Sequence, residues 1–453
     1  MGDRGRRTRM KSTLIKNARI VNEGKTFEAD LRIVNDRIAK LESEITAQPG
    51  DQIVDATGLH LIPGMIDDQV HFREPGLTHK GTIASESRAA VAGGITSYME
   101  MPNVNPATTT IEALESKFNI AAQHSAANYS FYLGATEENL EQIKRLDPRN
   151  HCGVKVFMGA STGNLLVENP TALEGIFRDS PTLIVTHCES GPVISRKREA
   201  LLSVKPELTI EDHPKLRDAE SCFVSSSYAV GLAKQFGSQL HVLHITTEKE
   251  LALFEPGPIQ KKNITAEVCV HHLWFSEQDY PRLGNLIKCN PSIKKQSDRD
   301  ALLNALHTNQ IDIVATDHAP HTWEEKQVAY DVAPAGLPLV QHALLTLLDH
   351  VNHNRLSLPQ VVYKTAHNPA IRYQISERGF IREGHYADLV LVDTQSPTLV
   401  TNENSLYHCG WSPFAGHQFS ASIKATWVNG QKVFDGSNVL PRTPTAKRLA
   451  FSA

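Results

Sequence analysis

The chain has 453 residues, with 46 Lys or Arg against 50 Asp or Glu, so its formal charge is −4. Hydrophobic residues make up 40% and charged residues 21%, a balance that predicts a globular protein and excludes extended disorder. No stretch approaches the roughly 18 consecutive apolar residues of a membrane span. The near-neutral charge argues against a nucleic-acid-binding protein, which usually presents a basic face.

The first residues, MGDRGRRTRM, are basic and lack the apolar core of a secretory signal. We predict a disordered leader over residues 1–11, with Met10 as a possible true start and a short mitochondrial presequence as the alternative. The six cysteines are scattered and form no CxxC pair. This pattern favours a reducing compartment over a disulfide framework, so we expect a cytoplasmic protein.

The two ends of the chain share one pattern of short strands and turns. Residues 12–60 contain TLIKNARIV, ADLRIVN and RIAKLES, and residues 375–440 contain ADLVLVD and SIKATWVNGQKVF. The Asn429-Gly430 pair predicts a hairpin turn. We therefore expect residues 1–60 and 373–453 to form one small β-sandwich domain that brackets the middle of the chain.

The middle of the chain, residues 61–372, alternates between apolar strands and helical stretches. The candidate strands are LIPGMIDDQVHF, GITSYMEMPN, NYSFYLGA, CGVKVFMG, TLIVTHCE, QLHVLHIT, ITAEVCVHH and IDIVATDHAPH. Eight strands alternating with helices predict an α/β fold in which this segment is a (β/α)8 TIM barrel. In such barrels the active site lies at the C-terminal ends of the strands.

Several of these strands end in polar residues directly after an apolar run. The clearest are His71, Lys155, His187, His244 and Asp317. Imidazoles and carboxylates are good zinc ligands, and a bound metal lowers the pKa of water to near neutrality. A single histidine at a strand end is more often a structural residue, but this many together predict a metal site. Asp317 could then serve as ligand and as general base and acid.

Because side chains alternate along a strand, the spacing of these candidates indicates which of them point into the barrel. Gln69 and His71 are two apart and face the same way. His241 and His244 are three apart, so in a regular strand only one points inward, and His244 is nearer the C-terminal end. Lys155 inside a barrel would be a costly cation unless it were neutralised or modified. We expect His241 and the adjacent pair His271-His272 to pack behind the ligands.

Two segments resemble a known family. The segment PGMIDDQVHFREPGLTHKGTIASESRAAVAGGITSYMEMPNVNP and the later ATDHAPH are similar to motifs of the amidohydrolase superfamily and, within it, of the dihydroorotases. The resemblance extends over about residues 12 to 435. It implies a binuclear zinc centre bridged by a carboxylated lysine, and a homodimer as a possible assembly.

The resemblance also implies roles residue by residue. His71 and Asp317 would hold the first metal, His187 and His244 the second, and Lys155 would bridge them. Asp317 would also transfer the proton. The substrate-binding residues would be Arg73, which would pair with a carboxylate, Asn103, Asn290 and His321, with weaker contacts from Ala335 and Gly336. The Gly-rich loop at 159–167 could close over the site.

Gln69 departs from the family motif, which has a histidine at this position. An amide oxygen is a weaker zinc ligand than an imidazole, so we expect the first metal to bind less tightly or to be absent. The segment Pro291-Ser292-Ile293-Lys294 also departs from the usual pattern. Neither change removes Lys155 or Asp317.

The function that the resemblance implies is a zinc-dependent dihydroorotase. Such an enzyme interconverts N-carbamoyl-L-aspartate and (S)-dihydroorotate with release or uptake of water, the third step of de novo pyrimidine synthesis. An allantoinase or hydantoinase would use the same ligands, although Arg73 and Asn103 suit an anionic substrate better. A third hypothesis, prompted by Gln69, is an inactive dihydroorotase-like subunit that supports a partner enzyme.

Overall fold

The computed structural model describes residues 12–159, 165–441 and 446–452. The predicted leader at 1–11, and most of the Gly-rich loop predicted to close over the site, lie outside the described residues. None of the helices in the described ranges has the length and apolarity that a bilayer crossing requires.

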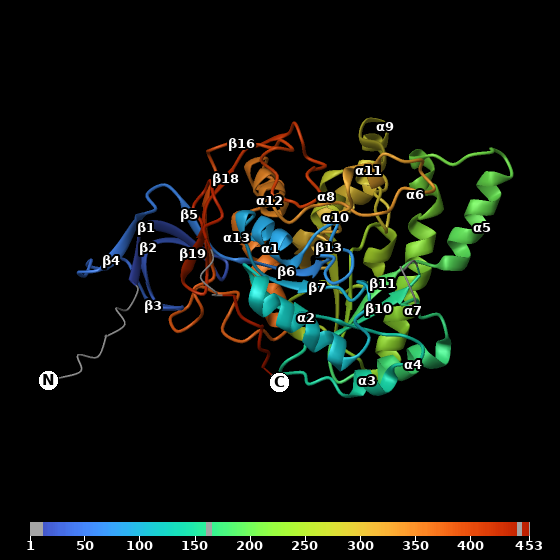
Figure 1. Ribbon diagram of the computed structural model, residues 1–453, viewed down its shortest axis with the longest axis horizontal. Coiled ribbons are helices and arrows are strands. Elements are labelled where there is room, and N and C mark those ends of the chain that lie inside the picture. Colours follow the sequence, from blue (N-terminus) through green and yellow to red (C-terminus); the bar gives the residue numbers. More distant parts are fainter. Residues whose placement is uncertain (1–11, 160–164, 442–445, 453) are drawn as a thin grey trace.

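The two ends of the chain meet in one sheet, seen at the left of Figure 1. Its strands are β1 (Ser12–Asn22), β2 (Lys25–Val34), β3 (Arg37–Glu42), β4 (Asp51–Asp55), β5 (His60–Pro63), β15 (Leu389–Asp393), β18 (Ser422–Val428) and β19 (Gln431–Phe434). They follow the order β19-β18-β15-β5-β1-β2-β3, and β4 pairs with β1. The antiparallel pairing of β5 with β15 confirms that the N- and C-terminal segments fold together.

This outer sheet has a hydrophobic core of its own. Ile15, Leu31, Leu61, Leu391 and Trp427 are almost fully buried and belong to one cluster. Many of their neighbours along the same strands, including Ile62, Val390 and Val428, are also buried and belong to the cluster that fills the rest of the molecule, so these strands are covered on both faces. A small pair of strands, β16 (Thr398–Leu399) and β17 (Gln418–Phe419), lies apart from this sheet.

The middle of the chain forms the predicted parallel barrel. Its strands are β6 (Met65–Val70), β7 (Ile95–Glu100), β8 (Asn128–Phe131), β9 (Leu133–Gly134), β10 (Val154–Met158), β11 (Ile184–Cys188), β12 (Leu240–Val242), β13 (Ile264–Cys269) and β14 (Ile313–Ala315). If β8 and β9 are taken as one strand interrupted at Tyr132, the described chain has eight barrel strands. The barrel closes where Val70 bridges His318 and the His71 amide donates to the His318 carbonyl at 2.7 Å.

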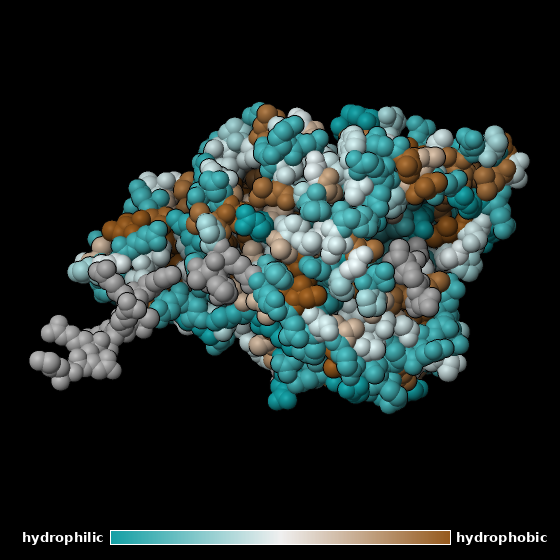
Figure 2. Space-filling view, viewed as in Figure 1, coloured by the Kyte–Doolittle hydropathy of each residue, from teal (hydrophilic) through white to brown (hydrophobic). Residues whose placement is uncertain are grey.

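Helices cover the outside of the barrel. They are α1 (Ile83–Ala92), α2 (Ile111–His124), α3 (Leu140–Lys144), α4 (Pro170–Asp179), α5 (Gly191–Leu202), α6 (His213–Leu216), α7 (Ala219–Phe236), α8 (Val270–Trp274), α9 (Tyr280–Leu283), α10 (Gln296–Thr308), α11 (Trp323–Lys326), α12 (Ala343–Asn352), α13 (Leu358–Val362) and α14 (Asn368–Arg372). Helix α7 shows why these segments are helical: the Asp218 side chain accepts from the Ser221 amide, and Gly237 ends the helix at φ 71°. On the face in Figure 2, hydrophilic side chains predominate and hydrophobic ones form scattered groups.

A buried polar network joins the barrel to the outer sheet. Asp388, just before β15, pairs with Arg378 and accepts from Asn128 of β8 at 3.1 Å. Asn429, just after β18, donates to Asn128 at 2.7 Å and accepts from Arg378 at 2.8 Å. All four of these residues are almost fully buried, so each depends on the others for its hydrogen bonds.

We expect Asp388→Asn to lower the free energy of unfolding by about 3–5 kcal/mol, because it leaves the Arg378 charge buried without its carboxylate. Glu23→Gln is the matched control, since it removes one carboxylate from the exposed Arg382–Glu23 pair and should cost about 1 kcal/mol or less. Urea denaturation measures both. Equal losses in the two variants would show that the network does not stabilise the junction.

Candidate metal centre and substrate pocket

A cavity of about 320 Å³ lies at the C-terminal ends of the barrel strands. Every residue that the sequence predicts for the site lines it: Gln69, His71, Arg73, Asn103, Lys155, His187, His244, Asn290, Asp317, His321, Ala335 and Gly336. The lining also includes residues that the sequence did not suggest, namely Phe157, Arg217, Cys289, Ala319 and Pro334. Side chains from far apart in the sequence therefore converge on one space.

Two histidines face each other on one side of this cavity. His187 Nδ1 lies 3.0 Å from His244 Nε2, and both rings are buried. Burial lowers the pKa of both, and the neighbouring His187 lowers the pKa of His244 further. Two neutral imidazoles with nitrogen atoms converging in this way form a donor set that suits a zinc ion.

A carboxylate on the outer nitrogen of His187 fixes the orientation of its ring. Its Nε2 lies 2.8 Å from Glu189 Oε2, which also accepts from Arg217 at 2.5 Å. Burial alone would raise the pKa of Glu189, but Arg217 and His187 lower it to about 2. A carboxylate on the outer nitrogen of a histidine is the usual support of a metal-binding imidazole. Glu189 follows His187 by two residues, so strand alternation could have placed the two on one face. Arg217 could not be found from spacing, because it meets them only through the fold.

Asp317 also lines this cavity, together with His71 and Gln69. Its Oδ1 lies 3.0 Å from His71 Nε2 and accepts from Gln69 Nε2 at 3.1 Å. Burial opposes ionisation, but the hydrogen bond and charge of His71 lower the pKa of Asp317 overall. In this arrangement the Gln69 Nε2 donates to the carboxylate, and the Gln69 Oε1, the atom that could bind a metal, lies 3.8 Å from Cys269 Sγ.

Lys155 lies within β10 and lines the same cavity, where its charge lowers the pKa of His71, His187, His244 and Asp317. It is 1% exposed, and its Nζ lies 4.7 Å from the centre of the Phe157 ring. Burial lowers the pKa of Lys155 to about 8. Burial therefore disfavours the charged form of this lysine, and a partner or a modification that removes the charge would relieve that cost.

Three residues of the cavity adopt left-handed backbone conformations. The φ angles are 73° at Arg73, 38° at His244 and 51° at Asp317. Such angles are uncommon for residues other than glycine and concentrate at functional sites. The expectation that only one of His241 and His244 points into the barrel is wrong. Strand β12 ends at Val242, and the left-handed turn at His244 redirects its side chain.

A second set of polar groups, Arg73, His321, Asn103 and Asn290, also lines the cavity. Arg73 is 6% exposed, donates to the Pro320 carbonyl at 3.0 Å and lies 3.0 Å from His321 Nε2. Burial lowers the pKa of Arg73 to about 10, so it remains a cation at neutral pH. Within the described residues no carboxylate forms an ion pair with it. The Oδ1 atoms of Asn103 and Asn290 are buried without hydrogen-bond partners among those residues.

Two further clusters of polar residues lie inside the barrel, and the sequence did not predict that their members meet. His241 Nε2 lies 3.2 Å from Asp68 and 3.6 Å from Glu267, and all three are fully buried. Glu267 Oε1 also accepts from the His244 backbone amide at 3.2 Å, so this group supports the turn that carries His244. The second group, Cys269, His271 and His272, also has converging ligand atoms. His241, His271 and His272 therefore lie inside, as expected for packing residues.

Comparisons with known proteins agree with this geometry. A model described as the amidohydrolase family matches residues 60–433. A dihydroorotase of Halobacterium salinarum is 33% identical over 418 residues, covering 90% of this chain and 94% of the relative. An allantoinase of Bacillus velezensis is 28% identical over 427 residues, covering 93% of each. Among solved structures, an L-hydantoinase (dihydropyrimidinase) from Arthrobacter aurescens superposes with a TM-score of 0.91 at 24% identity and covers 97% of this chain and 99% of its own.

The structural likeness establishes the fold, a TIM barrel with an attached β domain. It does not identify the substrate, which has to be inferred from the residues of the site. The sequence relatives include two different cyclic-amide activities by name. The residues that line the cavity must therefore discriminate between them.

We expect Glu189→Gln to weaken metal binding by about 10–100-fold, because His187 loses the charged partner that orients it. Competition with a chelator of known affinity measures the change without requiring activity. The control is Glu220→Gln, which alters an exposed carboxylate on α7. Unchanged metal affinity in Glu189→Gln would show that His187 is not a ligand.

Proposed function

Because this chain belongs to the amidohydrolase family, we propose that it is a zinc-dependent dihydroorotase that interconverts N-carbamoyl-L-aspartate and (S)-dihydroorotate. The observation that carries this proposal is the buried Arg73, which forms no ion pair within the described chain and lies in the same cavity as Lys155, His187 and His244. A buried guanidinium without a carboxylate partner suits a substrate carboxylate, which it can bind through two hydrogen bonds.

The remaining polar groups of the cavity suit the rest of this substrate. The buried Oδ1 atoms of Asn103 and Asn290 need donors, and the ring of dihydroorotate carries two N–H groups. His321 lies against Arg73 and would hold the guanidinium in place. Carboxylate recognition at one end and N–H recognition along the wall would orient the scissile amide toward His187 and His244.

The donor set fits zinc. His187 and His244 would hold one ion with Lys155, while His71 and Asp317 would hold a weaker second one. Zinc in this position supplies Lewis acidity and lowers the pKa of water toward neutrality. Carboxylation of Lys155 would first require loss of the proton of the ammonium group; the neutral Nζ would then form a bond to CO2 and release a second proton. The result would be a carbamate anion in place of a buried cation.

Asp317 would move the proton in both directions. In ring opening it passes a proton to the leaving nitrogen, and in ring closure it accepts the proton of the attacking amide. The hydrogen bond from Gln69 and the contact with His71 hold its carboxylate in the cavity. Its left-handed backbone, φ 51°, directs the side chain there.

The alternative is an allantoinase- or hydantoinase-type cyclic amidase, which the Bacillus velezensis relative favours. The same metal ligands would serve. A neutral cyclic amide, however, would leave the Arg73 charge buried without compensation, which is costly. An inactive subunit is the third possibility, and a dead wild-type protein with bound metal would favour it.

We expect the purified, zinc-supplemented protein to open dihydroorotate, followed as loss of the substrate's ultraviolet absorbance. Asp317→Ala should lower kcat by about 10²–10⁴-fold, because it removes the general acid and base. Arg282→Gln, which changes an exposed arginine on α9, should leave the rate unchanged. Absence of turnover by metal-loaded wild type would overturn the proposal.

Arg73→Gln separates the substrate hypotheses. For a dihydroorotase it should reduce kcat/KM for dihydroorotate by about 10²-fold or more, since a charged hydrogen bond contributes roughly 1.5–3 kcal/mol and two are lost. Hydantoin and allantoin turnover measured with the same two proteins provides the control. Greater wild-type activity on those neutral substrates, with little effect of Arg73→Gln, would favour the alternative.

Metal content tests the role of Gln69. Elemental analysis of protein purified without chelators should give about one zinc per chain, because the Gln69 amide donates to Asp317 in place of an imidazole ligand. Gln69→His should raise the content toward two. Two ions in the wild type would mean that Gln69 turns its oxygen to the metal or that a water completes the site.

A further inference from the structure

Strand β13 leads directly into helix α8, and three residues at this junction bring their ligand atoms together. Cys269 ends the strand, and His271 and His272 lie in the first turn of the helix. One atom of each residue, a sulfur and two ring nitrogens, lies within 4.8 Å of the other two. All three residues are buried, and none of them lines the catalytic cavity. A cluster of one thiol and two imidazoles therefore lies outside the proposed catalytic ligands.

The hydrogen bonding of His272 leaves one of its ring nitrogens unused. Its Nε2 lies 3.1 Å from the Pro291 carbonyl oxygen, which can only accept, so the proton of the neutral ring is on Nε2. Nδ1 then carries a lone pair, and it is buried without a hydrogen-bond partner among the described residues. A ring that donates one N–H to a backbone carbonyl and keeps its other nitrogen free has the usual arrangement of a metal-binding histidine.

His271 has no hydrogen-bond partner at either ring nitrogen among the described residues, although it is almost fully buried. Burial lowers the pKa of His271 to about 4 and the pKa of His272 well below its usual value, so both rings are neutral at neutral pH. A buried polar atom without a partner costs free energy. A metal ion would accept a lone pair from each ring and offset part of that cost.

Cys269 supplies the soft ligand of the cluster. Its Sγ lies 3.5 Å from Glu267 Oε1 and 3.8 Å from Gln69 Oε1, which are weak contacts for a thiol. Burial and the charge of Glu267 raise the pKa of Cys269 well above its usual value, so without a metal the thiol stays protonated. Metal binding would release this proton. A thiolate with two imidazoles favours a thiophilic metal ion over magnesium or calcium.

The number and the charge of these ligands favour a monovalent ion. Structural zinc sites are almost always four-coordinate, whereas this cluster offers three ligands. A monovalent ion bound by one thiolate and two neutral imidazoles has no net charge. A divalent ion would leave a positive charge in the protein interior, which is costly. Copper(I) is the monovalent ion that thiolate ligands select.

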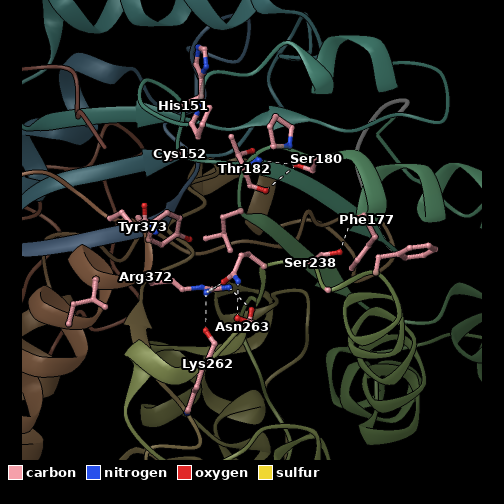
Figure 3. Close-up of a pocket in the computed structure, with 18 of the residues that line it drawn as sticks. His151, Cys152, Phe177, Ser180, Thr182, Ser238, Lys262, Asn263, Arg372 and Tyr373 are labelled. Carbon is pink, nitrogen blue, oxygen red and sulfur yellow. Dashed lines mark hydrogen bonds between the residues drawn. The ribbon is translucent and has the colours of Figure 1, made fainter. Parts of the chain in front are cut away.

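The cluster lies next to the catalytic end of the barrel. Gln69, whose Oε1 contacts Cys269, lines the catalytic cavity, and so does Cys289, whose Sγ lies 3.8 Å from His272 Nε2. The other large cavity, of about 660 Å³, lies at the N-terminal ends of β10 to β13 and is shown in Figure 3. Its lining includes Cys152 and no residue of the cluster. Cys152 therefore provides a buried thiol at the opposite end of the barrel for comparison.

We propose that Cys269, His271 and His272 bind one copper(I) ion beside the catalytic cavity. The ion would accept the sulfur and one nitrogen from each ring, and the thiol proton would pass to solvent. This site shares no ligand with the proposed catalytic centre and does not depend on the activity proposed there. Zinc bound by the catalytic residues would remain in place.

The test is a titration of the zinc-loaded full chain with copper(I) under anaerobic conditions, against a chromophoric copper(I) chelator of known affinity. We expect one copper(I) ion per chain and an unchanged zinc content. X-ray absorption at the copper edge should show one sulfur and two nitrogen ligands. Absence of copper binding, a copper site without sulfur, or loss of zinc in proportion to the copper bound would overturn the proposal.

Cys269→Ser should weaken copper(I) binding by about 100-fold or more, because loss of a direct ligand exceeds the roughly 10–100-fold effect of an outer contact. His271→Asn should also weaken binding, so the test survives if Cys269→Ser fails to fold. Cys152→Ser, which removes the buried thiol of the opposite cavity, is the matched control and should bind copper like the wild type. Equal binding by Cys269→Ser and Cys152→Ser, or loss of binding in Cys289→Ser alone, would overturn the proposal.

Discussion

The burial of basic side chains inside the barrel is the constraint on which the catalytic end of this structure depends. Lys155, His187 and His244 are nearly inaccessible, and burial lowers the pKa of each of them. A protein interior tolerates such groups when they are neutral or bound to a partner of opposite charge. Metal binding and carboxylation of Lys155 would meet both conditions, so the chemistry proposed for the site also removes its electrostatic cost.

The barrel fixes these groups through a layer of hydrogen bonds behind them. Glu189 and Arg217 orient His187, and Glu267 accepts from the backbone amide of His244. The left-handed backbone at His244 and Asp317 is a local strain that persists only where surrounding contacts hold it. The precision of the site therefore depends also on Glu189 and Glu267, which do not line the cavity.

The sequence predicted the barrel, and every residue that it predicted for the site lines the cavity. Both predictions rest on local signals, namely the periodicity of the strands and the residues at their ends. It failed wherever the answer depended on contacts across the barrel. Asp68, His241 and Glu267 come from three strands and meet only in the interior. Alternation also misjudged His241 and His244, since the regular strand stops at Val242 before the second histidine is reached. A turn conformation of this kind has no signature in the order of the residues.

The two mouths of the barrel pose one electrostatic problem with different solutions. At the C-terminal mouth Arg73 is near Asp317, whose charge raises its pKa against the effect of burial, yet it forms no ion pair within the described chain. At the N-terminal mouth Arg372 also lacks a carboxylate in contact, but its Nη1 and Nη2 each donate twice, to the Leu240, Asn263 and Lys262 carbonyls and to Gln239 Oε1. Arg73 uses only its Nε and Nη2 in this way, and its Nη1 forms no hydrogen bond within the described residues. Because a guanidinium keeps its charge near neutral pH, the arginine that retains a free donor is the one suited to an anion from solution.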